Sequence, residues 1–316
     1  MNTHTTPRRY SKLLSSLTSL FIGIIFIYSA YTKLFPIELF ELTFVDLGIA
    51  SWTFAPILAR LFIGIEFFLG VLLIVNLNPS GYTYKAVLVL LVAFTLYLII
   101  QILLNGNKGN CGCFGDALPM TPAEGILKNI LLIGAVALLY KFHKGYRLKY
   151  EKPIIITFCI AALSLPFVLN PVSFDASSNF DPNTKGYQLN MDLLYNSPDN
   201  PKPDKELRKG KWIVAYFSLT CKHCKIAAYK LQLIKKNNPE IPVYFILNGK
   251  EKNLQPFFNE TKSEHIPHIL FTGGDFIKMS GPELPAIFLL ENNIVQGRPN
   301  YFTLNQSEIE TWLQLR

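Results

Sequence analysis

The sequence predicts an all-α bundle of membrane-spanning helices followed by a smaller α/β domain. The chain of 316 residues is 50% hydrophobic, with a mean hydropathy of +0.27. Only 16% of its residues are charged, which is too few to cover a soluble protein of this length. The apolar excess lies in the first 170 residues. Beyond residue 186, short apolar strands alternate with helical patterns, as in an α/β domain.

About five apolar stretches in the N-terminal half are candidates to cross a bilayer, which takes about 20 residues. They cover residues 13–31, 54–75, 86–104, 125–140 and 154–169. A cleaved signal peptide is the alternative for the first, but Ser29-Ala30-Tyr31 is a poor cleavage site and further spans follow. We therefore predict a transmembrane domain over 1–170, a polar linker over 171–186 and a separate domain over 187–316.

The distribution of Lys and Arg predicts the orientation, because cytoplasmic loops are enriched in these residues. With the N-terminus inside, the inner segments carry nine of them: Arg8, Arg9, Lys12, Lys85, Lys141, Lys144, Arg147, Lys149 and Lys152. The outer loops carry Lys33 and Lys108, and Lys128 at the start of the fourth span makes a third if it snorkels outward. Acidic residues such as Asp116 lie nearby. We therefore expect a multi-pass protein of the bacterial inner membrane with a cytoplasmic N-terminus and a periplasmic C-terminal domain. The net charge of +8 then reports topology and not nucleic-acid binding.

The segment Cys221-Lys222-His223-Cys224 follows an apolar strand pattern and precedes a long helical pattern. Two thiols at this spacing, where a strand passes into a helix, suit dithiol and disulfide chemistry. The helix N-terminus is expected to stabilise a thiolate at Cys221, and Lys222 and His223 add positive potential. The alternatives are half of a zinc site, which needs two more ligands, and an inert pair.

A second thiol pair, Cys111 and Cys113, lies in the outer loop after the third span. A disulfide across one residue closes a tight ring, and strain in such a ring favours oxidation of a neighbouring dithiol. Gly112 supplies the backbone freedom that the ring requires. A fixed structural bridge, a metal role and a pair without exchange activity are the alternatives. Cys159, inside the fifth span, is expected to be inert apolar filler.

Glu66 lies inside the second span, where an ionised side chain is costly unless it is paired. Arg60 is the candidate partner, although a separation of six residues does not place the two on one helix face. Glu66 is either a polar tie between helices or a group that handles protons or binds a quinone. No cytochrome or flavin motif is present, so no bound cofactor is expected. The use of a quinone is the one cofactor question that the sequence leaves open.

Three segments of the C-terminal part carry a family resemblance, namely Gly210-Lys211-Trp212, Cys221-Lys222-His223-Cys224 and Leu284-Pro285-Ala286-Ile287-Phe288-Leu289-Leu290. On these segments, residues 187–316 resemble the thioredoxin-like fold, in particular the TlpA-like branch of membrane-anchored periplasmic thiol-disulfide oxidoreductases. The resemblance implies a cis proline that abuts the dithiol. Pro285 is preferred to Pro267, because a strand, a turn, a strand and a closing helix follow it. A lysine within the dithiol departs from the family pattern and bears on its redox poise.

The membrane part carries a second resemblance, on Tyr31-Thr32-Lys33-Leu34 with Pro36, then Arg60 and Glu66-Phe67-Phe68-Leu69-Gly70, and finally Asn110-Cys111-Gly112-Cys113-Phe114-Gly115. On these segments, residues 10–145 resemble the DoxX-like and MauE-like membrane families, the latter named for a methylamine utilisation protein. The resemblance implies a redox function in the cell envelope, but it does not identify the substrate.

These observations predict an inner-membrane thiol-disulfide oxidoreductase that exchanges disulfides with envelope protein thiols through Cys221 and Cys224, in relay with Cys111 and Cys113. Two alternatives stay open: a non-catalytic assembly or docking factor for an envelope complex, and a quinone-linked thiol oxidase. The expected partners are envelope protein thiols or disulfides and the lipid bilayer. The direction of electron flow is not determined by the sequence.

Overall fold

The computed structural model describes residues 6–77, 82–107, 109–115, 118–142, 151–172, 186–302 and 304–314. The chain divides into two compact units, Met1–Ser173 and Phe174–Arg316. Most of the predicted linker lies outside the described residues. The same is true of several residues used to predict the orientation, namely Arg147, Lys108, Lys144, Lys149 and Asp116.

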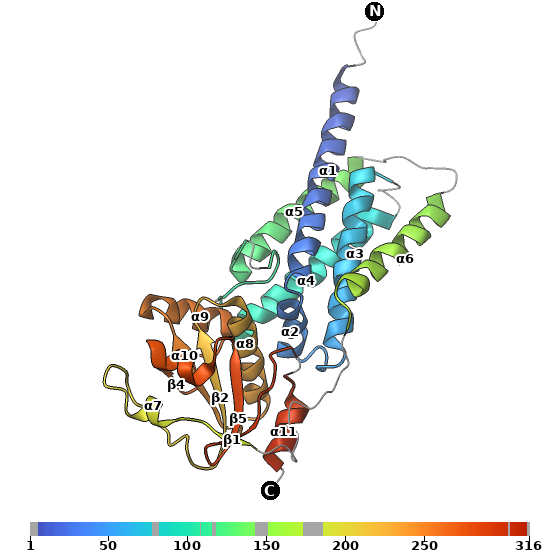
Figure 1. Cartoon of the computed structure of the whole chain (residues 1–316). Helices are drawn as coiled ribbons and strands as arrows, with labels where there is room; N and C mark the ends of the chain where they lie inside the picture. The colour runs from blue at the N-terminus through green and yellow to red at the C-terminus, as the bar shows by residue number, and fades with distance from the viewer. Residues whose placement is uncertain are drawn as a thin grey trace, which may run out of the picture. The chain divides into compact units, whose positions relative to one another are not determined.

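The N-terminal unit is a helix bundle (Figure 1). Its long helices are α1 (Thr6–Leu34), α3 (Ala55–Val75), α4 (Tyr84–Asn105), α5 (Pro122–Phe142) and α6 (Glu151–Leu169). In the described residues, 5 helices are long and apolar enough to cross a membrane, which confirms the predicted spans. A short helix, α2 (Glu38–Asp46), follows α1 and was not predicted.

Glycine residues allow the long helices to approach one another closely. A Cβ atom on Gly23 of α1 would lie 2.7 Å from the carbonyl oxygen of Gly70 on α3. A Cβ atom on Gly64 of α3 would lie 2.9 Å from the carbonyl oxygen of Ala162 on α6. Small residues at helix crossings are typical of membrane bundles, where close packing takes the place of the hydrophobic effect. Helix α3 is thereby held between α1 and α6.

The C-terminal unit is built on a 6-stranded sheet with the strand order β1-β6-β5-β2-β3-β4 in the described residues. The strands are β1 (Tyr187–Gln188), β2 (Lys211–Ser218), β3 (Val243–Asn248), β4 (His268–Leu270), β5 (Ala286–Glu291) and β6 (Ile294–Gly297). Strands β2, β3 and β4 are parallel, whereas β5 and β6 run antiparallel to their neighbours. This mixed sheet with a C-terminal hairpin is the predicted thioredoxin-like arrangement.

The helices of this unit are α7 (Asp192–Tyr195), α8 (Lys222–Asn237), α9 (Leu254–Thr261), α10 (Gly274–Ser280) and α11 (Gln306–Gln314), with a 3-10 turn at Glu251–Asn253. Strand β1 ends at Gln188, because the chain turns after it into α7. Helix α10 was not predicted, since its seven residues are too few to show an apolar period. The turn at Asn292 and Asn293 has positive φ at both residues (50° and 67°), as a tight hairpin requires.

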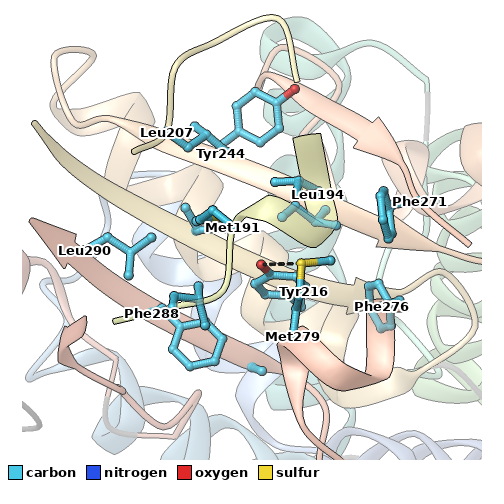
Figure 2. Close-up of a cluster of buried hydrophobic side chains, with 14 of the residues drawn as sticks. Met191, Leu194, Leu207, Tyr216, Tyr244, Phe271, Phe276, Met279, Phe288 and Leu290 are labelled. Atoms are coloured by element: carbon cyan, nitrogen blue, oxygen red, sulfur yellow. Dashed lines mark hydrogen bonds between the residues drawn. The ribbon is translucent and has the colours of Figure 1, made fainter. Parts of the chain in front are cut away.

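Strand β2 is buried on both faces, which anchors the turn that follows it. On one face, the ring of Tyr216 packs 5.7 Å from the rings of Phe276 and Phe288, and its hydroxyl lies 3.8 Å from the sulfur of Met279 (Figure 2). On the other face, Phe217 packs 5.0 Å from Phe245. Alternate residues of a strand point to opposite faces, so this core holds the C-terminal end of β2 from both sides.

Candidate redox sites

Cys221 is the N-cap residue of α8, with φ −77° and ψ 123°. Its sulfur accepts a hydrogen bond from the backbone N–H of Cys224 at 3.4 Å. This is the contact that a serine or aspartate oxygen makes at an N-cap. The positive end of the helix dipole therefore points at Sγ, an arrangement that favours negative charge there.

Cys224 lies behind Cys221 and is fully buried, whereas Cys221 is partly exposed. The backbone N–H of Ser218, the last residue of β2, donates to the Cys224 sulfur at 3.4 Å. Burial raises the pKa of Cys224 and so keeps its thiol protonated near neutral pH. The two thiols thus differ in the way that exchange chemistry requires. Cys221 is accessible to a substrate, whereas Cys224 is buried and protonated.

The other residues predicted at this site lie around the start of α8. His223 is exposed and its ring stacks on Tyr301, with ring centroids 5.2 Å apart. Lys222 is also exposed. The Leu284–Pro285 peptide bond is cis, whereas the bond before Pro267 is not. Because Ala286 pairs with Tyr216, Pro285 lies beside the end of β2 that leads to Cys221.

The membrane-side pair, Cys111 and Cys113, lies in the loop between α4 and α5, and Asn110 shapes this loop. The Asn110 side chain donates to the carbonyl of Gly115 at 2.7 Å and accepts from the N–H of Gly112 at 3.1 Å. Gly112 has a φ of 71°, a conformation that favours glycine. The N–H of Cys111 donates to the carbonyl of Met120 at 2.7 Å, which closes the loop.

Both sulfurs of this pair pack over Gly125 at the start of α5. A Cβ atom there would lie 3.2 Å from the Cys111 sulfur and 3.3 Å from the Cys113 sulfur. The hydrogen bond between the two thiols raises the pKa of Cys111 and lowers the pKa of Cys113, and the positive charge of Lys128 acts in the same direction on Cys113. Of the two sulfurs, Cys113 is thus the one at which the surroundings favour negative charge.

The predicted pairing of Arg60 with Glu66 is wrong. Glu66 is buried and pairs instead with Lys33 of α1, at 2.7 Å. Arg60 pairs with Glu41 of α2 at 2.6 Å and donates to the carbonyl of Asn170 at 2.7 Å, so it ties α3 to α2 and to the end of α6. Residues six apart on a helix face different sides, which explains the separate partners.

Lys33 is a buried residue that sequence reasoning did not place beside Glu66. The charge pattern placed it in an outer loop, but it lies in the last turn of α1 and is buried. Its ammonium group donates to Ser29 Oγ at 2.8 Å and to both oxygens of Glu66. Ser29 in turn donates to the carbonyl of Cys113 at 2.7 Å. The sequence contained a signal for the Lys33–Glu66 pair, because a lysine at the end of one span can pair with a glutamate inside the next.

A cavity of about 240 Å³ lies within the N-terminal unit and is lined by both Cys111 and Cys113. Lys33, Glu66 and Asn129 contribute polar groups to its wall, and most of the remaining lining is aliphatic or aromatic. No group of three or more His, Cys, Asp or Glu side chains in the described residues is placed to hold a metal ion. The cavity thus brings two predicted site features, Glu66 and the cysteine pair, to one place.

Comparisons with known proteins find similar sequences for much of the chain. Residues 11–142 match the family model described as Methylamine utilisation protein MauE. Protein TlpB of Flavobacterium psychrophilum is 26% identical over 291 aligned residues, covering 77% of this chain and 79% of the relative. The chain joins a MauE-like membrane region to a thioredoxin-like domain.

Two solved structures show distant likeness to the thioredoxin-like domain. A secreted Mycobacterium tuberculosis disulfide oxidoreductase homologous to E. coli DsbE is 14% identical and covers 32% of this chain and 81% of its own, with a TM-score of 0.27. The thioredoxin domain of a Bacteroides vulgatus thiol-disulfide oxidoreductase is 16% identical, with a TM-score of 0.29. The match covers 34% of this chain and 81% of that structure's chain. At these scores the likenesses say nothing about activity.

The two regions offer different chemistry. The thioredoxin-like domain presents one accessible sulfur at a helix N-terminus with a buried thiol behind it. The MauE-like region presents a pair of thiols at the wall of a cavity, with one sulfur favoured as thiolate. Each arrangement suits thiol and disulfide exchange.

Proposed function

We propose that the chain is a membrane-bound thiol-disulfide oxidoreductase whose Cys221 and Cys224 exchange disulfides with proteins of the cell envelope. The observation that carries this proposal is the asymmetry of the dithiol. The Cys221 sulfur caps α8 and is accessible, whereas Cys224 is buried behind it with its pKa raised by burial. An accessible nucleophile backed by a protonated resolving thiol is what disulfide exchange requires.

In the exchange, the Cys221 thiolate attacks one sulfur of a substrate disulfide and expels the other as a thiolate. A mixed disulfide between Cys221 and the substrate results. The Cys224 thiol then loses its proton and attacks the Cys221 sulfur, which releases the second substrate thiol and leaves a Cys221–Cys224 disulfide. The same steps in reverse oxidise a substrate dithiol, so the oxidation state of the domain sets the direction.

The surplus of Lys and Arg on one side of the spans supports a periplasmic position for both thiol pairs. We extend the proposal to a relay, in which Cys111 and Cys113 exchange electrons with the Cys221–Cys224 pair. The compartment, the orientation and the relay all belong to the proposal. All three depend on one condition, which is that both thiol pairs lie in the same outer compartment. Two thiol pairs can exchange disulfides only when they share a compartment.

The proposal is tested by trapping substrates with Cys224→Ala in membranes that carry the full chain. We expect mixed disulfides that contain Cys221, released by reductant and absent from the Cys221→Ser/Cys224→Ala double variant. Cys159→Ala is the matched control, since Cys159 lies in α6 and takes no part in the mechanism. If no adduct forms, while a Cys221→Ser/Cys224→Ser chain still supports growth, the domain is a docking module and the proposal fails.

The relay is tested by alkylating Cys111 and Cys113 in a chain that carries Cys221→Ser and Cys224→Ser. We expect the membrane pair to change its redox state when its exchange partner is lost. An unchanged ratio of oxidised to reduced Cys111 and Cys113 would contradict the relay and leave the exchange chemistry of the domain untouched.

A further inference from the structure

We infer that the cavity of the MauE-like region binds the ring of a membrane quinone, which accepts the electrons of Cys111 and Cys113. This inference rests on the proposed function, because it names the oxidant for the same thiol relay. The cavity, its unpartnered donor and its redox-active wall each contribute a separate argument.

The size and lining of the cavity suit one substituted aromatic ring. A cavity of ~150 Å³ lined by apolar side chains accepts benzene, and this cavity has a volume of about 240 Å³. Phe62, Phe94 and Tyr97 belong to its wall. Aromatic side chains pack favourably against a flat ring in offset or edge-to-face geometry. The space therefore fits a quinone head group, while an isoprenoid tail would extend toward the lipid.

The cavity also contains a hydrogen-bond donor without a partner. Asn129 of α5 lines the wall and is 2% exposed. Among the described residues its Nδ2 has no hydrogen-bond partner. Buried donors are nearly always satisfied, so an orphaned amide facing a cavity indicates a missing acceptor. A quinone carbonyl supplies that acceptor, whereas a lipid acyl chain has none to offer.

Lys33 and Glu66 already pair with each other at this wall. The Lys33 ammonium has three donors, and it donates to Ser29 Oγ and to the two oxygens of Glu66. Lys128 also belongs to the wall, and its ammonium lies 4.5 Å from the centroid of the Phe114 ring. Asn129 differs from these charged groups because its amide is a buried donor with no partner among the described residues.

The redox step balances without another reactant. The thiols of Cys111 and Cys113 together lose two electrons and two protons as their S–S bond forms. The quinone gains the same two electrons and two protons and becomes a quinol. Electrons then flow from envelope thiols through Cys221 and Cys224 to the membrane pair and into the quinone pool.

Binding is tested on the full chain in detergent with Cys111→Ser and Cys113→Ser, so that no turnover occurs. An azido derivative of ubiquinone is photolysed with the protein, and the labelled peptides are mapped with unlabelled decylubiquinone as competitor. We expect competed labelling on α4 or α5. Labelling that decylubiquinone does not displace, or that maps only to the outer surfaces of the helices, overturns the inference.

The role of Asn129 is tested by titrating decylubiquinone into Asn129→Leu. Loss of one hydrogen bond predicts affinity weaker by roughly tenfold. Gln101→Leu is the matched control, because Gln101 is a second buried amide with an unpartnered atom among the described residues but does not line the cavity. Equal affinities for the two variants overturn the inference.

Failure here is separable from failure of the proposed function. If decylubiquinone does not bind while Cys224→Ala still traps substrates on Cys221, the quinone site is wrong and the exchange activity stands. If decylubiquinone binds at the cavity while no substrate is trapped, the site stands and the proposed function fails.

Discussion

The hydroxyl of Ser29 donates a hydrogen bond of 2.7 Å to the backbone carbonyl of Cys113. Through this contact, helix α1 holds the loop that carries the membrane thiols. Ser29 also accepts from Lys33, which pairs with Glu66 of α3. A buried ion pair between two membrane helices is therefore connected, through Ser29, to the backbone of Cys113.

Replacing Ser29 with alanine should loosen this loop. Removing one buried hydrogen bond costs about 1 kcal/mol, and the Cys113 carbonyl and Lys33 each lose a partner. We expect maleimide to modify the reduced Cys111 and Cys113 pair several times faster in Ser29→Ala than in the unsubstituted chain. Ser164→Ala is the control, because Ser164 bonds within its own helix at an exposed position. Equal rates in the two variants would contradict the holding role of Ser29.

Breaking the Lys33–Glu66 pair should destabilise the membrane region strongly. Removing one partner of a buried ion pair costs about 3–5 kcal/mol, because the other charge is left uncompensated. We therefore expect Glu66→Gln to lower the temperature at which the purified chain loses its monodisperse state. The double variant Lys33→Met/Glu66→Met should recover much of the loss.

The Lys225–Glu260 pair provides the control for that comparison. Its side chains are 25% and 40% exposed, and a pair exposed to this degree contributes about 0–1 kcal/mol. Glu260→Gln should leave the transition temperature nearly unchanged. A loss in Glu260→Gln as large as in Glu66→Gln would show that burial of the pair is not the cause.

A methyl group at Gly125 should disturb the thiol pair. Its Cβ would lie 2.9 Å from Leu98 Cδ1 and within 3.3 Å of both sulfurs, and such overpacking costs about 1–3 kcal/mol. Gly134 lies on the same helix, where a Cβ atom would have none of the described atoms within 4 Å. We expect Gly125→Ala to lower thermal stability and Gly134→Ala to maintain or raise it, since alanine favours helix. The reverse order would contradict the packing of the sulfurs on Gly125.

The buried Cys224 thiol predicts a pH dependence for the reduced thioredoxin-like domain. Burial raises its pKa in the folded state, whereas an unfolded thiol has a pKa of about 8.5. Above that pH the unfolded state loses a proton that the folded state keeps, so folding stability falls as the pH rises. Below it the contribution is fully present.

This dependence can be followed by tryptophan fluorescence during urea unfolding, because Trp212 and Trp312 both lie in this domain. We expect the midpoint of the reduced chain to fall between pH 7 and pH 10 more steeply than that of Cys224→Ala. Iodoacetamide at pH 7 should modify Cys221 and spare Cys224 until the domain unfolds. Equal labelling of both thiols in the folded chain would argue against the asymmetry on which the exchange mechanism depends.

Much of the fold was predictable because it depends on local pattern. The membrane spans follow from runs of apolar residues, and the hairpin follows from Asn292-Asn293 between two apolar strands. The position of Cys221 at the start of α8 follows from a strand pattern that gives way to a helical one. The short extent of strand β1 and the short helices α2, α7 and α10 were missed, because elements of that length carry too little periodicity.

The sequence by itself determined which chemistry the protein carries. It placed two thiol pairs, one after a membrane span and one at a strand-to-helix turn, and these positions follow from spacing along the chain. Tertiary structure alone decided which groups surround them. Lys33 meets Glu66, Arg60 meets Glu41, and Gly125 lies beneath both membrane thiols because separate helices cross there. Such contacts depend on how helix faces pack in three dimensions, and the order of residues along one helix does not specify which neighbour each face meets.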